Sequence, residues 1–88
     1  MFNCILLVLD DTNAVVNQTK NLKFKTLPLK NELLLLCRRH SRNTTYAVQQ
    51  IVPILFFETG ECIQYAIVVK NTTSTNLPIP VQITFEDI

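Results

Sequence analysis

Apolar and polar residues alternate with a period of two along several short stretches of this chain. In residues 63–69 every second side chain is large and apolar, and residues 81–85 follow the same pattern. Residues 22–26 alternate too, with Lys23 and Lys25 on the polar side. Because successive side chains of a strand point to opposite faces of a sheet, these stretches predict half-buried strands.

Two other stretches are apolar at consecutive positions. Phe2–Leu9 is apolar on both faces, which predicts a strand in the middle of a sheet or beneath a partner subunit. Leu33–Cys37 is ambiguous, because leucine favours a helix, here over about residues 29–41. Four consecutive leucines leave no amphipathic stripe, so we favour a strand. The alternative is an α+β protein with one helix at 29–41.

Turn-forming residues separate these stretches about every ten residues. Asp10–Asn13 predicts one turn, and Glu58–Glu61 predicts a hairpin turn, because it holds Gly60, the only glycine. Residues 14–19 predict a short return strand or a loop. Residues 46–57 predict an extended segment in which Pro53 requires a bulge, a bend or an edge position.

These elements define the predicted fold class. Six or seven short strands without an internal repeat predict a mainly β protein, a small antiparallel barrel or sandwich, in one domain of residues 1–88. The stretch Thr26–Leu33, followed by a strand and then by Tyr46-Ala-Val, resembles part of many small SH3-like barrels. In those barrels a Leu-Pro turn and an acidic residue often precede a strand. The likeness covers less than a third of the chain and lacks the turn glycine usual in those barrels, so an SH3-like barrel is one form that the predicted fold can take.

Composition supports a small globular domain. Of the 88 residues, 48% are hydrophobic and only 17% are charged, so the surface must be unusually neutral. A single glycine excludes a glycine-rich phosphate loop and a dinucleotide-binding fingerprint. There is no basic leader and no apolar run near 20 residues, and three cysteines without a CxxC motif are typical of free thiols. We therefore expect a cytoplasmic protein with no membrane partner.

The cations are unevenly distributed. Residues 20–42 hold seven of the eight lysines and arginines and one carboxylate, a net charge of +6. Guanidinium groups and an aromatic ring can hold phosphates and stack on bases. The candidate residues for binding an anionic partner are Arg38, Arg39, Arg42, Lys23, Lys25 and Tyr46. The competing interpretation is a solvated loop that keeps the protein soluble.

Residues that could carry catalysis or bind a metal are present but poorly arranged. His40 and Ser41 are sequence neighbours and do not face each other, and Glu58 and Glu61 flank a turn tip instead of a cleft. Possible zinc ligands lack close cysteine spacing. They are Cys4, Cys37, His40 and Cys62. We expect no enzyme activity, no cofactor and no metal.

Low surface charge also predicts self-association. Phe2–Leu9 is apolar on both faces, and Ala66 and Val68 lie on the face of their strand expected to be wet. Such surface usually marks an interface. We therefore predict a small non-enzymatic interaction module that binds a macromolecular partner, an unidentified protein, and forms a homo-oligomer. The alternative is a nucleic-acid-binding small barrel that uses the basic segment 20–42.

Overall fold

The chain folds as a curved sheet of seven strands, with no helix among the residues described. The computed structural model describes residues 2–38, 43–72 and 81–86. The strands are β1 (Phe2–Leu9), β2 (Val15–Gln18), β3 (Leu22–Phe24), β4 (Leu33–Arg38), β5 (Thr44–Leu55), β6 (Cys62–Asn71) and β7 (Val81–Glu86). The mainly β prediction is confirmed. The strand interpretation of Leu33–Cys37 is also confirmed, and the helical alternative is wrong over the described part of 29–41.

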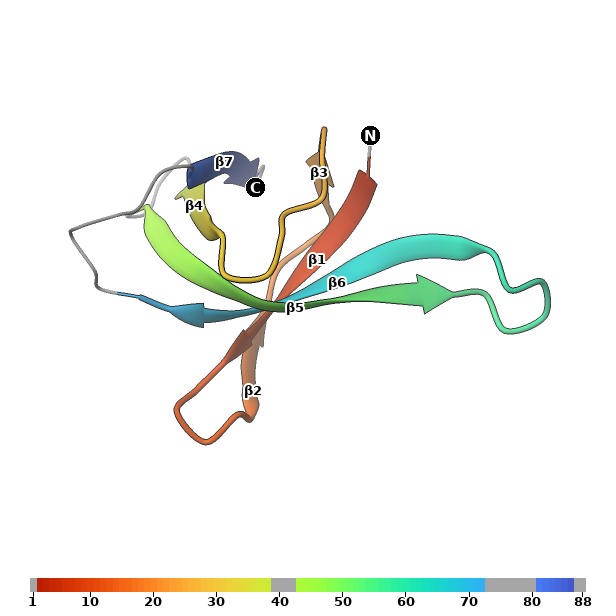
Figure 1. The fold of residues 1–88 in the computed structure, drawn as a ribbon, viewed down its shortest axis with the longest axis horizontal. Helices are drawn as coiled ribbons and strands as arrows, with labels where there is room; N and C mark the ends of the chain where they lie inside the picture. Colours follow the sequence, from red (N-terminus) through yellow and green to blue (C-terminus); the bar gives the residue numbers. More distant parts are fainter. Residues whose placement is uncertain (1, 39–42, 73–80, 87–88) are drawn as a thin grey trace.

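The strands follow the order β2-β1-β6-β5-β4-β7, and β3 pairs with the beginning of β1. The sheet curls until β7 lies beside β3, which gives a half-barrel (Figure 1). The pairs β1–β6 and β4–β7 are parallel, so the sheet is mixed and not wholly antiparallel as predicted. Alternation fixes the face that each side chain takes but carries no information on the direction of the neighbouring strand.

The core lies on the concave face of this sheet, where rows of apolar side chains run across the strands. Leu6 on β1 pairs in register with Ile67 on β6, and Ile67 pairs with Ile51 on β5. The remaining buried core residues come from five strands: Cys4, Val8, Leu22, Phe24, Leu34, Leu36, Tyr46, Val48 and Val69. Ala66 is buried and Val68 is half-buried, so the expected wet face of β6 is largely covered within the chain.

The segment after β3 closes one side of the core. Pro28 is fully buried, and Leu27 packs against the core cluster. The backbone N–H of Asn31 donates to the Val48 carbonyl at 2.9 Å, and the Val48 N–H donates to the Glu32 carbonyl at 2.9 Å. This pair of bonds satisfies the edge of β5 beside its bulge at Val48–Gln50 and holds the segment 25–32 against the sheet.

Thr19 joins β2 to β3 along the same edge of β1. Its backbone N–H donates to the Leu6 carbonyl at 3.0 Å, and its Oγ1 accepts the Leu6 N–H at 3.0 Å. The same hydroxyl donates to the Lys20 carbonyl at 3.0 Å. A buried side-chain hydroxyl thus replaces a backbone acceptor where the strand is interrupted. Within the alternating stretch at residues 22–26, only Leu22–Phe24 forms a strand.

Candidate interaction surface

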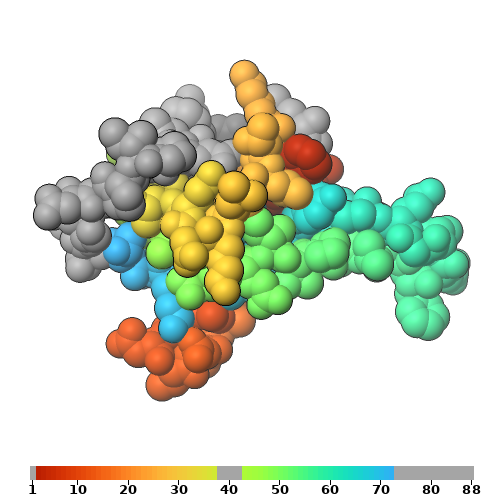
Figure 2. Space-filling model, viewed as in Figure 1, coloured from red at the N-terminus to blue at the C-terminus, as the bar shows by residue number. Residues whose placement is uncertain are grey.

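The hairpin of β5 and β6 extends beyond the rest of the sheet. The last row that includes β1 is formed by Cys4, Tyr65 and Pro53. Past that row, residues 54–64 have no strand neighbour outside the hairpin among the described strands. We call residues 54–64 the arm. Figure 2 shows the arm standing away from the body, and the molecule measures 44 Å along its longest axis against 29 and 24 Å along the others.

The arm carries large apolar side chains that the body does not cover. Phe57 at the turn is fully exposed, at 101%. Leu55, Phe56 and Ile63 are 47–54% exposed. These four side chains lie beside the exposed Glu58, Thr59 and Glu61, so the arm presents apolar and acidic groups together. The sequence placed Phe57 at the end of a strand but gave no sign that the partners of that strand would stop short of it.

The turn that presents Phe57 is well defined. The Phe56 N–H donates to the Glu61 carbonyl at 2.7 Å, and the Gly60 N–H donates to the Phe56 carbonyl at 2.7 Å. Thr59 Oγ1 accepts the Glu61 N–H at 3.2 Å. Gly60 has a φ of 73°, a conformation that glycine adopts without strain, which confirms the predicted hairpin turn. These bonds define the turn, and Phe57 at that turn is not packed against the body.

Side-chain contacts fix the base of the arm. The rings of Phe2 and Tyr65 meet edge to face with centroids 5.8 Å apart. Gln64 Nε2 donates to Asn21 Oδ1 at 2.9 Å, which ties β6 to the chain entering β3. A hydrogen bond to the Cys62 thiol is the main cause that raises the pKa of Tyr65. An open pocket of about 220 Å³ lies between these groups, lined by Phe2, Asn3, Cys62, Ile63, Gln64 and Tyr65.

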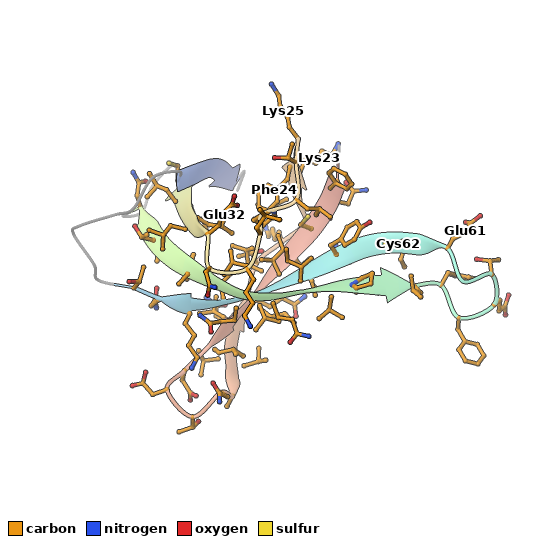
Figure 3. All side chains as sticks on the ribbon, in the orientation of Figure 1. Lys23, Phe24, Lys25, Glu32, Glu61 and Cys62 are labelled. Atoms are coloured by element: carbon orange, nitrogen blue, oxygen red, sulfur yellow. The ribbon has the colours of Figure 1, made fainter. Side chains whose placement is uncertain are left out.

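Charges of opposite sign lie on separate parts of the surface. The arm has Glu58 and Glu61, both exposed. On β3 and the segment after it, Lys23, Lys25 and Lys30 are exposed. Figure 3 places the Lys25 side chain pointing out of the body above β3, whereas Glu61 lies beside the turn at the far end of the arm. The surface is therefore polarised, although the whole chain carries only +1.

Of the six residues expected to bind an anionic partner, the structure describes the side chains of three. Lys23 and Lys25 are exposed, as that hypothesis requires. Tyr46 is buried in the core, so its ring is not free to stack on a base. Arg39 and Arg42 lie outside the described residues, as does the side chain of Arg38, whose backbone ends β4. Of the six side chains the structure describes Lys23, Lys25 and Tyr46, and Tyr46 does not share the exposed surface of the two lysines.

The described residues also show how the candidate chemical groups lie. Cys4 is buried, which raises the pKa of its thiol to about 11, and Cys62 is exposed. No group of three or more His, Cys, Asp or Glu side chains gathers as a metal site within the described ranges, and His40 lies outside them. Nor does any described helix have the length and apolar character needed to cross a membrane.

Comparison of the chain with protein-family models, with curated proteins and with solved structures gave no match. Evidence for function therefore comes from the residues of the chain itself. Among them the arm has the largest uncovered apolar side chains, on a turn with defined hydrogen bonds.

Proposed function

We propose that this protein is a non-enzymatic interaction module that self-associates through the arm, as a platform for a macromolecular partner. The observation that carries the proposal is the full exposure of Phe57 on an ordered turn, beside three further apolar side chains that are about half exposed. A side chain of this size is seldom left in water at the tip of a rigid element unless it binds something.

The size of the surface supports this function. A fully exposed aromatic side chain presents roughly 150–250 Å², so the four arm residues together offer on the order of 500 Å² of apolar surface. An apolar area of that size is comparable with the largest patch on a typical monomer, and patches of that size are often functional. Two copies would contribute about 1,000 Å², and polar atoms around them would bring the total to the 1,200–2,000 Å² of a stable interface.

Self-association also compensates for a small core. A chain of 88 residues buries only roughly 60–65% of its unfolded surface and is correspondingly marginal in stability. Contact between subunits adds stability that grows with protein concentration, because only the folded chain associates. The apolar residues of the arm would then stabilise the fold without belonging to the core of their own subunit.

The test is the mass of the protein in solution, measured by light scattering on a gel-filtration column. The wild-type chain should exceed its monomer mass of 10.1 kDa at micromolar concentration. The double variant Phe56→Ser with Phe57→Ser should elute as a monomer. A matched control is Val15→Ser with Val16→Ser, because these β2 side chains are 57 and 61% exposed but lie outside the arm.

The control variant should keep the wild-type mass, and circular dichroism should show that all three proteins retain their strands. A wild-type chain that stays at 10.1 kDa up to about 100 μM would overturn self-association. Nucleic acid carried by a nuclease-treated preparation would instead support the alternative function, and absorbance at 260 nm would reveal it, because the chain has two tyrosines and no tryptophan.

A further inference from the structure

We infer that the partner of the arm is a second copy of this chain, and that the arm docks on the segment of residues 23–30, which Figure 2 shows uncovered on the side in view. This segment exposes Lys23, Lys25, Leu29 and Lys30, and we call its surface the basic face. This inference rests on the proposed self-association and adds the site and its chemistry. In the dimer each arm would lie on the basic face of the other subunit. The two contacts are then identical.

The arm and the basic face carry charges of opposite sign. Residues 44–69, which include the arm, contain two glutamates and no lysine or arginine. Residues 12–31, which include the basic face, contain four lysines and no carboxylate. Surfaces of opposite sign steer association and disfavour wrong partners. Two arms brought together would instead set their glutamates against one another.

The basic face also offers apolar contact. Leu29 is 68% exposed and stands between Lys25 and Lys30 in the chain. The aliphatic stems of lysine side chains cover apolar groups while their ammonium groups stay in water. Phe57 of an incoming arm could therefore pack on Leu29 and the lysine stems, with Glu58 beside the ammonium groups. A cation over the ring face would add a further favourable contact.

Glu32, which follows this segment in the chain, does not neutralise the basic face. Glu32 Oε2 accepts the backbone N–H of Leu29 at 3.0 Å, so its carboxylate is directed at the turn that shapes the segment. Glu32 is half-buried, whereas Lys23, Lys25 and Lys30 are exposed. Figure 3 shows Glu32 close to the sheet and Lys25 extending away from it. The ammonium groups are therefore open to a partner.

A second acidic hairpin tip, at the turn between β1 and β2, is the natural competitor for the basic face. Asp10 and Asp11 lie there, but the Asp10 carboxylate already accepts hydrogen bonds from the Thr12 N–H at 2.8 Å, the Thr12 hydroxyl at 2.6 Å and the Ala14 N–H at 3.0 Å. These bonds hold the turn and lower the pKa of Asp10. The tip has no aromatic side chain, so the arm is the better match.

Reciprocal docking predicts a closed dimer. When the arm of each subunit contacts the basic face of the other, the same surface patch serves both subunits and a two-fold axis relates them. No surface of this kind is then left unsatisfied to recruit a third copy. The expected mass is twice 10.1 kDa and does not rise further with concentration.

Charge reversal tests the inference. The variant Glu58→Lys with Glu61→Lys should weaken self-association at least tenfold in Kd, because like charges then meet. Lys23→Glu with Lys25→Glu should weaken it to a similar extent. An equimolar mixture of these two variants should form a heterodimer near the wild-type Kd, because each of its two contacts again pairs glutamate with lysine. The matched control Asp11→Lys should leave the Kd within about threefold.

The outcomes separate this inference from the proposed function. A wild-type chain that is monomeric overturns the function. Suppose that the wild type dimerises and the Phe56→Ser, Phe57→Ser variant is monomeric, but each charge-reversed double variant dimerises as the wild type does. Self-association then stands, and docking on the basic face is overturned. If each charge-reversed double variant is monomeric and their equimolar mixture is monomeric too, reciprocal docking is overturned. The inference is supported if the mixture forms heterodimers while each double variant by itself is monomeric.

Discussion

β5 and β6 pass through two different surroundings within one hairpin. In the body, Val48 and Val69 face each other on the concave side and are completely buried, because neighbouring strands and the segment 25–32 surround them. In the arm, Leu55 and Ile63 belong to the same two strands and are about half exposed. The residues are equally apolar, so the difference comes from the length of the neighbouring strands.

The apolar residues of the arm therefore contribute less to the core of their own subunit than those of the body do. A residue of the core loses many contacts when it is shortened, whereas a half-exposed residue loses fewer and the fully exposed Phe57 has almost none to lose. Substitutions in the body should therefore lower the stability of the subunit, and substitutions in the arm should affect association instead. The experiments that follow test this division, starting from the largest expected effect.

Leu34→Ala in the body should have the largest effect. Leu34 is fully buried on β4, opposite Tyr46, so the change removes its contacts and leaves a cavity that costs about 2–5 kcal/mol of unfolding free energy. The same truncation in the arm, Phe57→Ala, should change it by less than about 0.5 kcal/mol once association is excluded. Both substitutions are made in the Phe56→Ser variant, and urea unfolding at low protein concentration measures the unfolding free energy of each.

An arm substitution that lowered the stability of the dilute subunit as much as Leu34→Ala would contradict the division. Circular dichroism at two protein concentrations supplies the control, because a contribution from association depends on concentration and one from the core does not.

Part of this picture followed from the sequence. Alternation predicted that Leu22 and Phe24 would be buried and Lys23 exposed, as they are. It could not predict the arm, since the alternating apolar pattern of β6 continues from Ile67 through Tyr65 to Ile63, although the pairing with β1 ends at Tyr65. The burial of Tyr46 was missed for a related reason. Its position after a basic cluster suggested surface chemistry, whereas its register opposite Leu34 places it in the core.

Thr19→Val tests how the body stays continuous where β2 gives way to β3. The hydroxyl that accepts the Leu6 N–H would be lost, and a buried donor without a partner costs about 1–3 kcal/mol. Thr19→Ser keeps the hydroxyl and should lose less. Thermal unfolding of both variants measures the effect. A larger loss in Thr19→Ser than in Thr19→Val would mean that packing of the methyl group matters more than the hydrogen bond, because valine keeps that methyl group and serine does not.

Gly60→Ala should act only on the arm. Its φ of 73° is unfavourable for a side chain and costs about 1 kcal/mol, whereas an added Cβ would meet nothing within 4 Å. Hydrogen exchange at the Phe56 amide, which bonds to the Glu61 carbonyl, should become faster. Exchange at the Leu6 amide in the body should not change. Gly60→Asn should have a smaller effect, because asparagine tolerates this conformation.

Faster exchange at both amides would show that the arm and the body open together. Exchange confined to the arm would show that its turn can loosen while the core remains closed, as expected of an element with free edges on both sides.

The smallest expected effect contrasts one residue type in the two regions. Cys62 in the arm is exposed, whereas Cys4 in the body is buried, and that burial is the main reason that its pKa rises from 9.0 to about 11. Thiolates react with iodoacetamide and thiols do not. In the monomeric Phe56→Ser, Phe57→Ser variant at pH 8, iodoacetamide should alkylate the exposed Cys62 and leave the buried Cys4 almost unmodified. Peptide mass spectrometry measures both.

The raised pKa of Cys4 also sets a sign for stability. The folded chain keeps the thiol proton that the unfolded chain loses above pH 9, so this contribution is complete below pH 9 and disappears as the pH rises to about 11. Urea unfolding should therefore show stability that declines over this range, and Cys4→Ala should decline less than its parent. An equal decline in both proteins would assign the pH dependence to other groups. In the alkylation experiment, rapid modification of Cys4 at pH 8 would show that the body opens as readily as the arm.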